Sequence, residues 1–280
     1  MRIVAGSRRQ SPAVCCLNYC FAAGAICGLR LLGYVPESDL TAAWRRPDLL
    51  RLDYDTYRAL PAIANSDLSR LRDALDGRPP RPDGSGGNAG ALSFGTAFHT
   101  ALLEPTDYLP GQPGLNDTLV WWLVEGVKLV PHLAELLEQG TPEPSCVFQE
   151  SETGTLCKLR ADLVLDVPGQ PHTIVDFKTT NARDAEHFRW QCSAYDYDRQ
   201  AAFYTDALRA ERFLLVGVQK VEPFGVFPLE VSPLMLDEGR LKYQRLLRLL
   251  RAPATAPAYR AQAVQAAVEQ LGLSPETDSE

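Results

Sequence analysis

The stretch Leu156–Thr180 constrains the fold more than any other part of the chain. Its sequence, LCKLRADLVLDVPGQPHTIVDFKTT, contains two extended segments joined by a turn rich in proline and glycine. Side chains two apart on a strand point to the same face, so Asp176 and Lys178 are expected to project together while Phe177 points into packing. A hairpin between the two segments would bring Asp162 back towards Asp176.

Two carboxylates beside one ammonium admit two interpretations. The first is a site for a hard metal ion with a catalytic lysine, because hard cations prefer oxygen ligands. The second is a solvated strand end with a surface ion pair. This stretch alone does not choose between them, so the other segments must decide.

Length and charge limit the classes of protein to which the chain can belong. Its 280 residues, 45% of them hydrophobic, can bury the core of one large domain or of two small ones. The net charge of -7 argues against a protein that coats nucleic acid by bulk electrostatics. It does not argue against a local metal site, whose carboxylates are themselves negative.

The cysteines predict a reducing, cytoplasmic environment rather than a disulfide framework. Their number is odd, and the last three stand far apart without a CxxC pair. Cys16 and Cys20 have helical spacing, but no histidine or later cysteine cluster completes a ligand set for zinc or an iron–sulfur cluster. The seven are Cys15, Cys16, Cys20, Cys27, Cys146, Cys157 and Cys192.

Residues 1–50 form an N-terminal extension for which three interpretations stay open. Arg8 and Arg9 precede an apolar run over residues 13–28, a pattern that resembles a signal peptide and lies near the lower limit of a membrane span. The first interpretation is non-native sequence upstream of the true domain, such as an over-extended start. The others are a real targeting or membrane element and a buried helix. We expect no membrane partner for the rest of the chain.

Helical patterns precede the central stretch. Ser66 is a natural N-cap for a helix that continues to residue 75, and a second helix, SFGTAFHTALLEP, has an apolar stripe and ends at its proline. His99 lies beside that stripe, and a lone helical histidine is more often a packing or surface residue than a ligand. A third apolar helix follows, and the indoles of Trp121 and Trp122 are expected in the core.

The remaining patterns predict alternating strands and helices. The expected strands are 146–151, 156–165, 172–178, 213–221 and 225–231, and the expected helices are 194–210 and one that starts at Pro233. The last two strands pair through a turn around Pro223. This order suits an α/β (α+β) fold with a central mixed sheet flanked by helices. We expect one domain over residues 51–252 and a tail over 253–280 with a weak helix.

Taken together, these segments resemble the PD-(D/E)XK nuclease superfamily, and most closely the C-terminal nuclease domain of exodeoxyribonuclease VIII (RecE-type) of phages and prophages. The resemblance spans residues 54–250 and rests on YRALPAIANSDLSRL, on FGTAFHTALLEP, on GTLCKLRADLVL with IVDFKTT, and on YDYDRQAAFY. A D-x-K triplet alone is common by chance, whereas four such segments in this order are much more specific. The resemblance implies a restriction-endonuclease-like core.

The resemblance also implies a role for each matching residue. The implied ligands for Mg²⁺ or Mn²⁺ are the side chains of His99, Asp162 and Asp176 and the backbone carbonyl of Phe177. Lys178 matches the lysine that positions and activates the attacking water. Gln200 and Tyr204 match an element that contacts DNA and supports the active site. The implied catalytic residues are Asp162, Asp176, Lys178, Gln200 and Tyr204. Glu150 lies where some relatives have another acidic residue.

The function implied by the resemblance is a Mg²⁺-dependent exodeoxyribonuclease, most closely a 5′-to-3′ enzyme on double-stranded DNA in phage-type recombination. The implied partners are double-stranded DNA ends, a single-strand-annealing protein and further copies of the chain in a ring. Two alternatives stay open. One is another enzyme of the superfamily, an endonuclease or a Cas4-like protein, although no cysteine follows Cys192 to hold the iron–sulfur cluster of Cas4-like relatives. The other is a non-catalytic DNA-binding module, which the net negative charge disfavours.

Overall fold

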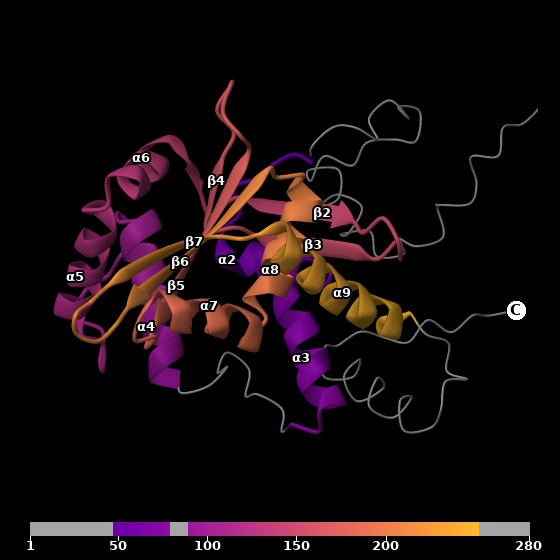
Figure 1. Cartoon of the computed structure of the whole chain (residues 1–280), viewed down its shortest axis with the longest axis horizontal. Coiled ribbons are helices and arrows are strands. Elements are labelled where there is room, and N and C mark those ends of the chain that lie inside the picture. The colour runs from indigo at the N-terminus through magenta and orange to yellow at the C-terminus, as the bar shows by residue number, and fades with distance from the viewer. Residues whose placement is uncertain (1–46, 79–88, 252–280) are drawn as a thin grey trace, which may run out of the picture. The chain divides into compact units, whose positions relative to one another are not determined.

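The computed structural model describes residues 47–78 and 89–251 (Figure 1). The chain divides into two compact units, Met1–Asp48 and Leu49–Glu280, and nearly all described residues belong to the second. The expectations for the signal-like N-terminal segment, its four cysteines and the tail helix fall on residues outside the described ranges. Among the described helices, none is both long and apolar enough to cross a membrane.

A five-stranded mixed sheet with the strand order β1-β4-β5-β6-β7 forms the centre of the fold. Its strands are β1 (Thr141–Pro142), β4 (Leu163–Leu165), β5 (Thr173–Thr180), β6 (Arg212–Gln219) and β7 (Val226–Glu230). β5 and β6 run parallel, and the other neighbouring pairs are antiparallel. A parallel pair needs a long crossover, which two helices provide here. The mixed sheet between helices confirms the predicted fold class.

A second sheet has only two strands, which run antiparallel. They are β2 (Ser145–Gln149) and β3 (Leu156–Arg160). The prediction of one strand over residues 156–165 is therefore wrong, because β3 ends at Arg160 and the chain resumes as β4, from Leu163, in the larger sheet.

Backbone hydrogen bonds hold the crossing between the two sheets. Ala161 N donates to Pro144 O at 3.0 Å, and Glu143 N donates to Asp162 O at 2.9 Å. Both residues of the crossing thus keep hydrogen-bond partners while the chain changes sheets, as buried backbone requires. The crossing leaves Asp162 between the end of one sheet and the start of the other.

Helices cover both faces of the larger sheet (Figure 1). One face packs against α4 (Ala89–Leu103), α5 (Asp117–Lys128) and α6 (Pro131–Gln139). The other side holds α2 (Tyr54–Ala59), α3 (Asn65–Leu75), α7 (Ala185–Ala194), α8 (Tyr197–Leu208) and α9 (Pro233–Leu250). Strand alternation divides the core between them: Ile174 of β5 packs with α8, whereas Val175 and Phe177 pack with α4 and α5.

Two helical predictions need correction. The helix predicted over residues 194–210 is present but shorter: α8 spans Tyr197–Leu208, because Asp196 before it and Arg209 after it adopt left-handed conformations with φ of 59° and 52°. Ala194 is instead the last residue of α7. α3 begins after Ala64, whose backbone N–H donates to the carboxylate of Asp67 at 2.8 Å. Ser66 therefore lies inside the helix and is not its N-cap.

The tryptophans of α5 lie on the surface rather than in the core. The exposed fractions are 38% for Trp121 and 62% for Trp122, so the prediction that their indoles are buried is wrong. The helix buries a stripe of aliphatic residues instead, at the i, i+3, i+4 and i+7 positions of one face. These are Val120, Leu123, Val124 and Val127.

Candidate active site

The candidate site lies at the edge of β5, where its neighbour β4 begins. β4 pairs with residues 173–175, and no other strand among the described residues pairs with the rest of β5 on that side. Asp162, just before β4, takes the place of the missing strand, because its Oδ2 accepts a hydrogen bond from Phe177 N at 2.7 Å. The side chain of Phe177 is 1% exposed and packs on the α4 side, as its alternation with Asp176 predicts.

Asp176 and Lys178 project together from β5. Lys178 Nζ lies 2.7 Å from Asp176 Oδ2, and Gln200 Nε2 of α8 donates to Asp176 Oδ1 at 2.6 Å. Asp176 is 0% exposed, so both of its carboxylate oxygens face protein groups rather than bulk water. Lys178 Nζ also lies 5.1 Å from the ring centroid of Tyr197, within the range of a cation–π contact.

His99 reaches the site from α4. Its Nδ1 lies 3.4 Å from Asp162 Oδ2, and its side chain is 24% exposed, which leaves the imidazole accessible. The preceding residue, Phe98, is fully buried in the core between α4 and the sheet and so fixes the helix that carries the histidine. His99 thus lies against one of the two aspartates of the site.

Glu143, which the sequence prediction missed, belongs to the same cluster. One ligand atom from each of His99, Glu143 and Asp162 lies within 4.8 Å of the others. Glu143 has a φ of 51°, a left-handed conformation that is costly for a residue other than glycine and often marks a functional position. Its carboxylate accepts a hydrogen bond from Arg160 Nε at 2.5 Å. The sequence signal was an acidic residue between two prolines, but its backbone conformation is not readable from the sequence.

Glu150, by contrast, is part of a turn. Its carboxylate accepts hydrogen bonds from Glu152 N at 3.1 Å and from Thr153 N at 2.8 Å, and it also accepts one from Thr153 Oγ1 at 2.6 Å. These bonds close the connection between β2 and β3. Glu150 thus stabilises this turn, and the ligand cluster found among the described residues contains Glu143 instead.

The pKa values of the three carboxylates at the site are displaced in different directions. Burial alone would raise the pKa of Asp162, but His99, Lys178 and the amide of Phe177 outweigh it and lower that pKa. For Asp176, burial and the charge of Asp162 outweigh Lys178 and raise the pKa to about 6. Burial and the charge of Asp162 likewise raise the pKa of Glu143, against the opposing effect of Arg160.

The two basic groups of the site are both held towards their charged forms. Burial would lower the pKa of His99, but the Asp162 carboxylate outweighs it and the pKa is raised. Burial would also lower the pKa of Lys178, yet Asp176 and Asp162 raise it. Lys178 is accordingly a cation at neutral pH, able to donate hydrogen bonds but not to accept a proton.

The donor set of the cluster fits a divalent cation. One imidazole nitrogen and two carboxylates are groups that commonly bind divalent metal ions in proteins. His99, Glu143 and Asp162 could hold such an ion within the distances given above. Asp176 is not in this set, because its oxygens contact Lys178 and Gln200, so its predicted part as a ligand requires one of these contacts to be exchanged.

Gln200 and Tyr204 are one helical turn apart on α8 and support the site in different ways. Gln200 contacts Asp176 directly, whereas Tyr204 Oη donates to Arg160 O at 3.2 Å. Arg160 closes β3 immediately before the crossing that carries Asp162, and it also contacts Glu143. Tyr204 therefore acts on the end of β3 rather than on the cluster itself.

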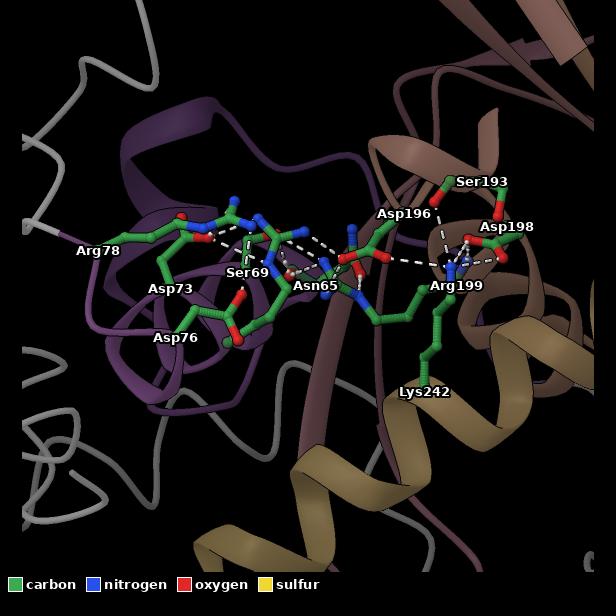
Figure 2. Close-up of polar contacts among 11 residues, drawn as sticks. Asn65, Ser69, Asp73, Asp76, Arg78, Ser193, Asp196, Asp198, Arg199 and Lys242 are labelled. Carbon is green, nitrogen blue, oxygen red and sulfur yellow. Dashed lines mark hydrogen bonds and ion pairs between the residues drawn. The ribbon is translucent and has the colours of Figure 1, made fainter. Parts of the chain in front are cut away.

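A buried polar network fixes the start of α8 against α3 and α9 (Figure 2). Arg199, 1% exposed, donates to Asp196 Oδ2 at 2.9 Å and to Ser69 Oγ of α3 at 2.6 Å. Lys242 of α9 donates to Asp198 Oδ2 at 2.8 Å. Because Arg199 precedes Gln200, these contacts set the position from which Gln200 reaches Asp176.

Comparison with known proteins places this site in a wider context. Residues 123–256 match a family described as a PDDEXK-like domain of unknown function (DUF3799). The match includes Glu143, Asp162, Asp176 and Lys178 but not His99. No curated protein matches the chain.

One solved structure shares the fold at low sequence identity. The chain is similar to a candidate exonuclease from Eubacterium rectale, with a TM-score of 0.52 and 16% identity, over 71% of this chain and 86% of that one. A phage-related exonuclease from Haemophilus somnus matches at 13% identity over 75% of this chain and 94% of that one, with a TM-score of 0.33. The family match supports the PD-(D/E)XK superfamily, and the first structure shows a shared fold.

Proposed function

We propose that this chain is a metal-dependent deoxyribonuclease that hydrolyses phosphodiester bonds at the ends of linear double-stranded DNA. One observation carries the proposal: the cluster of His99, Glu143 and Asp162 lies beside the Asp176–Lys178 pair at a single edge of β5. The second interpretation of these charges, a solvated strand end, fits poorly because Asp176 is fully buried. The match to a PDDEXK-like domain supports the nuclease class.

Each group of the site has a chemical part in this proposal. His99, Glu143 and Asp162 would hold Mg²⁺ or Mn²⁺, which when bound supplies Lewis acidity towards a phosphate oxygen. Lys178, protonated beside two carboxylates, orients the attacking water and stabilises the negative charge that develops on the phosphate. Asp176 holds the ammonium of Lys178 in place, and Gln200 holds Asp176.

The finer features of the proposed activity rest on the resemblance of the four sequence segments. That resemblance supports 5′-to-3′ polarity, a single-strand-annealing partner, assembly into a ring and action in the cytoplasm. It also supports the Phe177 carbonyl and Asp176 as further ligands and Tyr204 as a residue of the catalytic machinery. These features are proposals that extend the nuclease assignment.

Replacement of Lys178 tests the proposed reaction. Lys178→Ala should abolish Mg²⁺-dependent degradation of linear duplex DNA while the far-UV circular dichroism spectrum stays unchanged. Lys128→Ala is a matched control, because Lys128 is exposed at the end of α5 and pairs with Glu125 on the same helix. Undiminished degradation by the Lys178 variant would overturn the assignment of Lys178.

Metal binding tests the ligand cluster independently of cleavage. In titration calorimetry with Mn²⁺, Glu143→Gln and Asp162→Asn should weaken binding at least ~10-fold, since loss of a ligand or its partner typically has this effect. Glu135→Gln, on the exposed face of α6, is the control and should bind like the wild type. Equal binding by the Glu143 and Glu135 variants would remove Glu143 from the ligand set.

A set of DNA substrates separates the exonuclease from its alternatives. Linear duplexes labelled at one end or the other report polarity by the order in which label is released, and a closed circle should resist digestion. Cleavage of the closed circle would favour an endonuclease. Binding of Mn²⁺ without cleavage of any substrate would favour a non-catalytic DNA-binding module.

A further inference from the structure

Helix α7 presents large aromatic side chains to solvent beside the candidate site. The exposed fractions are 63% for Trp190 and 55% for Tyr195, which directly follows the helix. The opposite face of α7 buries Phe188 and Cys192 against the sheet, so these exposed aromatics are not needed for the core. Exposed aromatic residues next to a site often mark a binding surface.

One line of contacts connects this surface to Lys178. Lys178 Nζ lies 5.1 Å from the ring centroid of Tyr197, and that ring lies 5.9 Å from the ring of Tyr195. The aromatic contacts therefore begin at the ammonium of the candidate site and lead outward to an exposed ring.

A second line of contacts starts two residues further along β5. Thr180 Oγ1 donates to Gln191 Oε1 at 2.5 Å, and Gln191 Nε2 lies 3.5 Å from His187 Nε2. The His187 ring in turn lies 5.9 Å from the ring of Trp190. Since Lys178 and Thr180 share one face of the strand, the two lines leave the site side by side.

The charges around α7 favour contact with bases over contact with phosphates. Asp184 and Glu186 are exposed, and so are Arg183 and Arg189, which gives two negative and two positive groups. Such a balanced surface has little attraction for a phosphate backbone. Aromatic rings, by contrast, stack on any base irrespective of its sequence.

We propose that His187, Trp190, Tyr195 and Tyr197 form an aromatic wall on which bases of a single-stranded DNA segment stack while the adjoining phosphate lies at Lys178. This inference rests on the proposed nuclease function and specifies its substrate: the strand that enters the site is unpaired next to the reacting phosphate. The wall would then hold terminal nucleotides that have separated from their complement.

Binding of oligonucleotides without metal tests the wall separately from cleavage. In EDTA, the affinity of the whole chain for an oligothymidylate is compared, by fluorescence anisotropy, with its affinity for an abasic oligomer of equal length. Trp190→Ala and Tyr195→Ala should each weaken the binding of oligothymidylate at least ~5-fold. Neither variant should change the affinity for the abasic oligomer or the dependence of oligothymidylate affinity on salt concentration. Trp122→Ala removes an equally exposed indole from α5 and should bind like the wild type.

The outcomes separate the two proposals. If the wild type binds both oligomers equally, or if the Trp190 and Trp122 variants behave alike, the wall is refuted whatever the nuclease activity. A changed oligomeric state of the Trp190 variant in sedimentation, with unchanged DNA binding, would identify a protein interface and also refute it. The wall is supported if the wild type binds oligothymidylate more tightly than the abasic oligomer and the Trp190 variant loses this preference. If the same wild-type sample then shows no metal-dependent cleavage, only the proposed reaction is overturned.

Discussion

Replacement of Gly239 by alanine tests how closely α9 must approach the helix that carries Gln200. A Cβ added at Gly239 would lie 2.1 Å from Asp198 O, 2.5 Å from Asp198 C and 2.9 Å from Arg199 N. Ordinary contacts of a Cβ begin near 3.4 Å, so α9 would have to withdraw by about 1 Å. The obstacle is backbone, which cannot rotate away as a side chain can.

The expected loss of stability is the difference between two effects. Overpacking of a tight core contact costs ~1–3 kcal/mol, and the backbone obstacle places Gly239→Ala at the upper end. Alanine in a helix interior regains ~1 kcal/mol relative to glycine, so the net destabilisation should be ~2 kcal/mol. Gly126→Ala in α5 is the matched control, because its Cβ would meet nothing closer than Val226 Cγ2 at 3.9 Å. That variant should be stabilised by up to ~1 kcal/mol.

Urea denaturation followed by circular dichroism measures both variants. The free energies of unfolding of the two should differ by ~3 kcal/mol, the sum of the two expected changes. Gly239→Ala should also reduce nuclease activity under conditions where it is fully folded, because the start of α8 positions Gln200 against Asp176. Equal stability of the two variants would refute the close approach of α9 to α8, and with it the inferred effect on Gln200.

Three further predictions follow from the charges and the burial of particular groups. Burial would raise the pKa of Asp196, but Arg199 and neighbouring cations outweigh burial and lower that pKa. The Asp196 carboxylate therefore stabilises the fold fully above the unfolded-state pKa of ~3.9, and this stabilisation is lost as the pH falls from there through the lower folded-state pKa. In urea denaturation between pH 7 and pH 3, the free energy of unfolding of Asp196→Asn should be ~3 kcal/mol below that of the wild type at pH 7, and this difference should shrink below pH ~4. A difference that does not change with pH would contradict this prediction. Mn²⁺ at a hundredfold excess over its dissociation constant should stabilise the folded chain by ~2.7 kcal/mol in thermal unfolding and EDTA should reverse the shift, whereas an Mn²⁺-insensitive melting temperature would argue against the cluster. Burial raises the pKa of Cys157 and of Cys192 to about 12. After treatment with iodoacetamide at pH 8, peptide mapping should therefore find both thiols unmodified until urea is added. Rapid alkylation of the native chain would show that the two thiols are accessible.

Local patterns predicted the second half of the fold well. The strand pair around Pro223 and the helix that starts at Pro233 are confirmed, because turn residues and hydrophobic periodicity act over a few residues. The shared direction of Asp176 and Lys178 follows from strand alternation in the same way. The exposure of Trp122 was also readable in principle, since the aliphatic residues of α5 already form a complete buried stripe.

Contacts between distant segments were not predictable from such patterns. Residues 156–165 were predicted to form one strand because apolar residues occur throughout the segment, yet the chain changes sheets where Ala161 N donates to Pro144 O. The break between α7 and α8 depends on Asp196, whose left-handed conformation is compatible with a network that spans three helices. Neither feature leaves a periodic signal, because each is decided by tertiary partners.

These unpredicted breaks are also what assembles the candidate site. If β4 continued from β3 without interruption, Asp162 would be an ordinary strand residue and could not accept the hydrogen bond of Phe177 N at the open edge of β5. The same crossing places the amide of Glu143 against Asp162 O and so brings a second carboxylate to His99. The D-x-K triplet supplies one half of the site from local sequence alone. The other half exists only because regular structure stops there, which explains why the triplet was found first and Glu143 only in three dimensions.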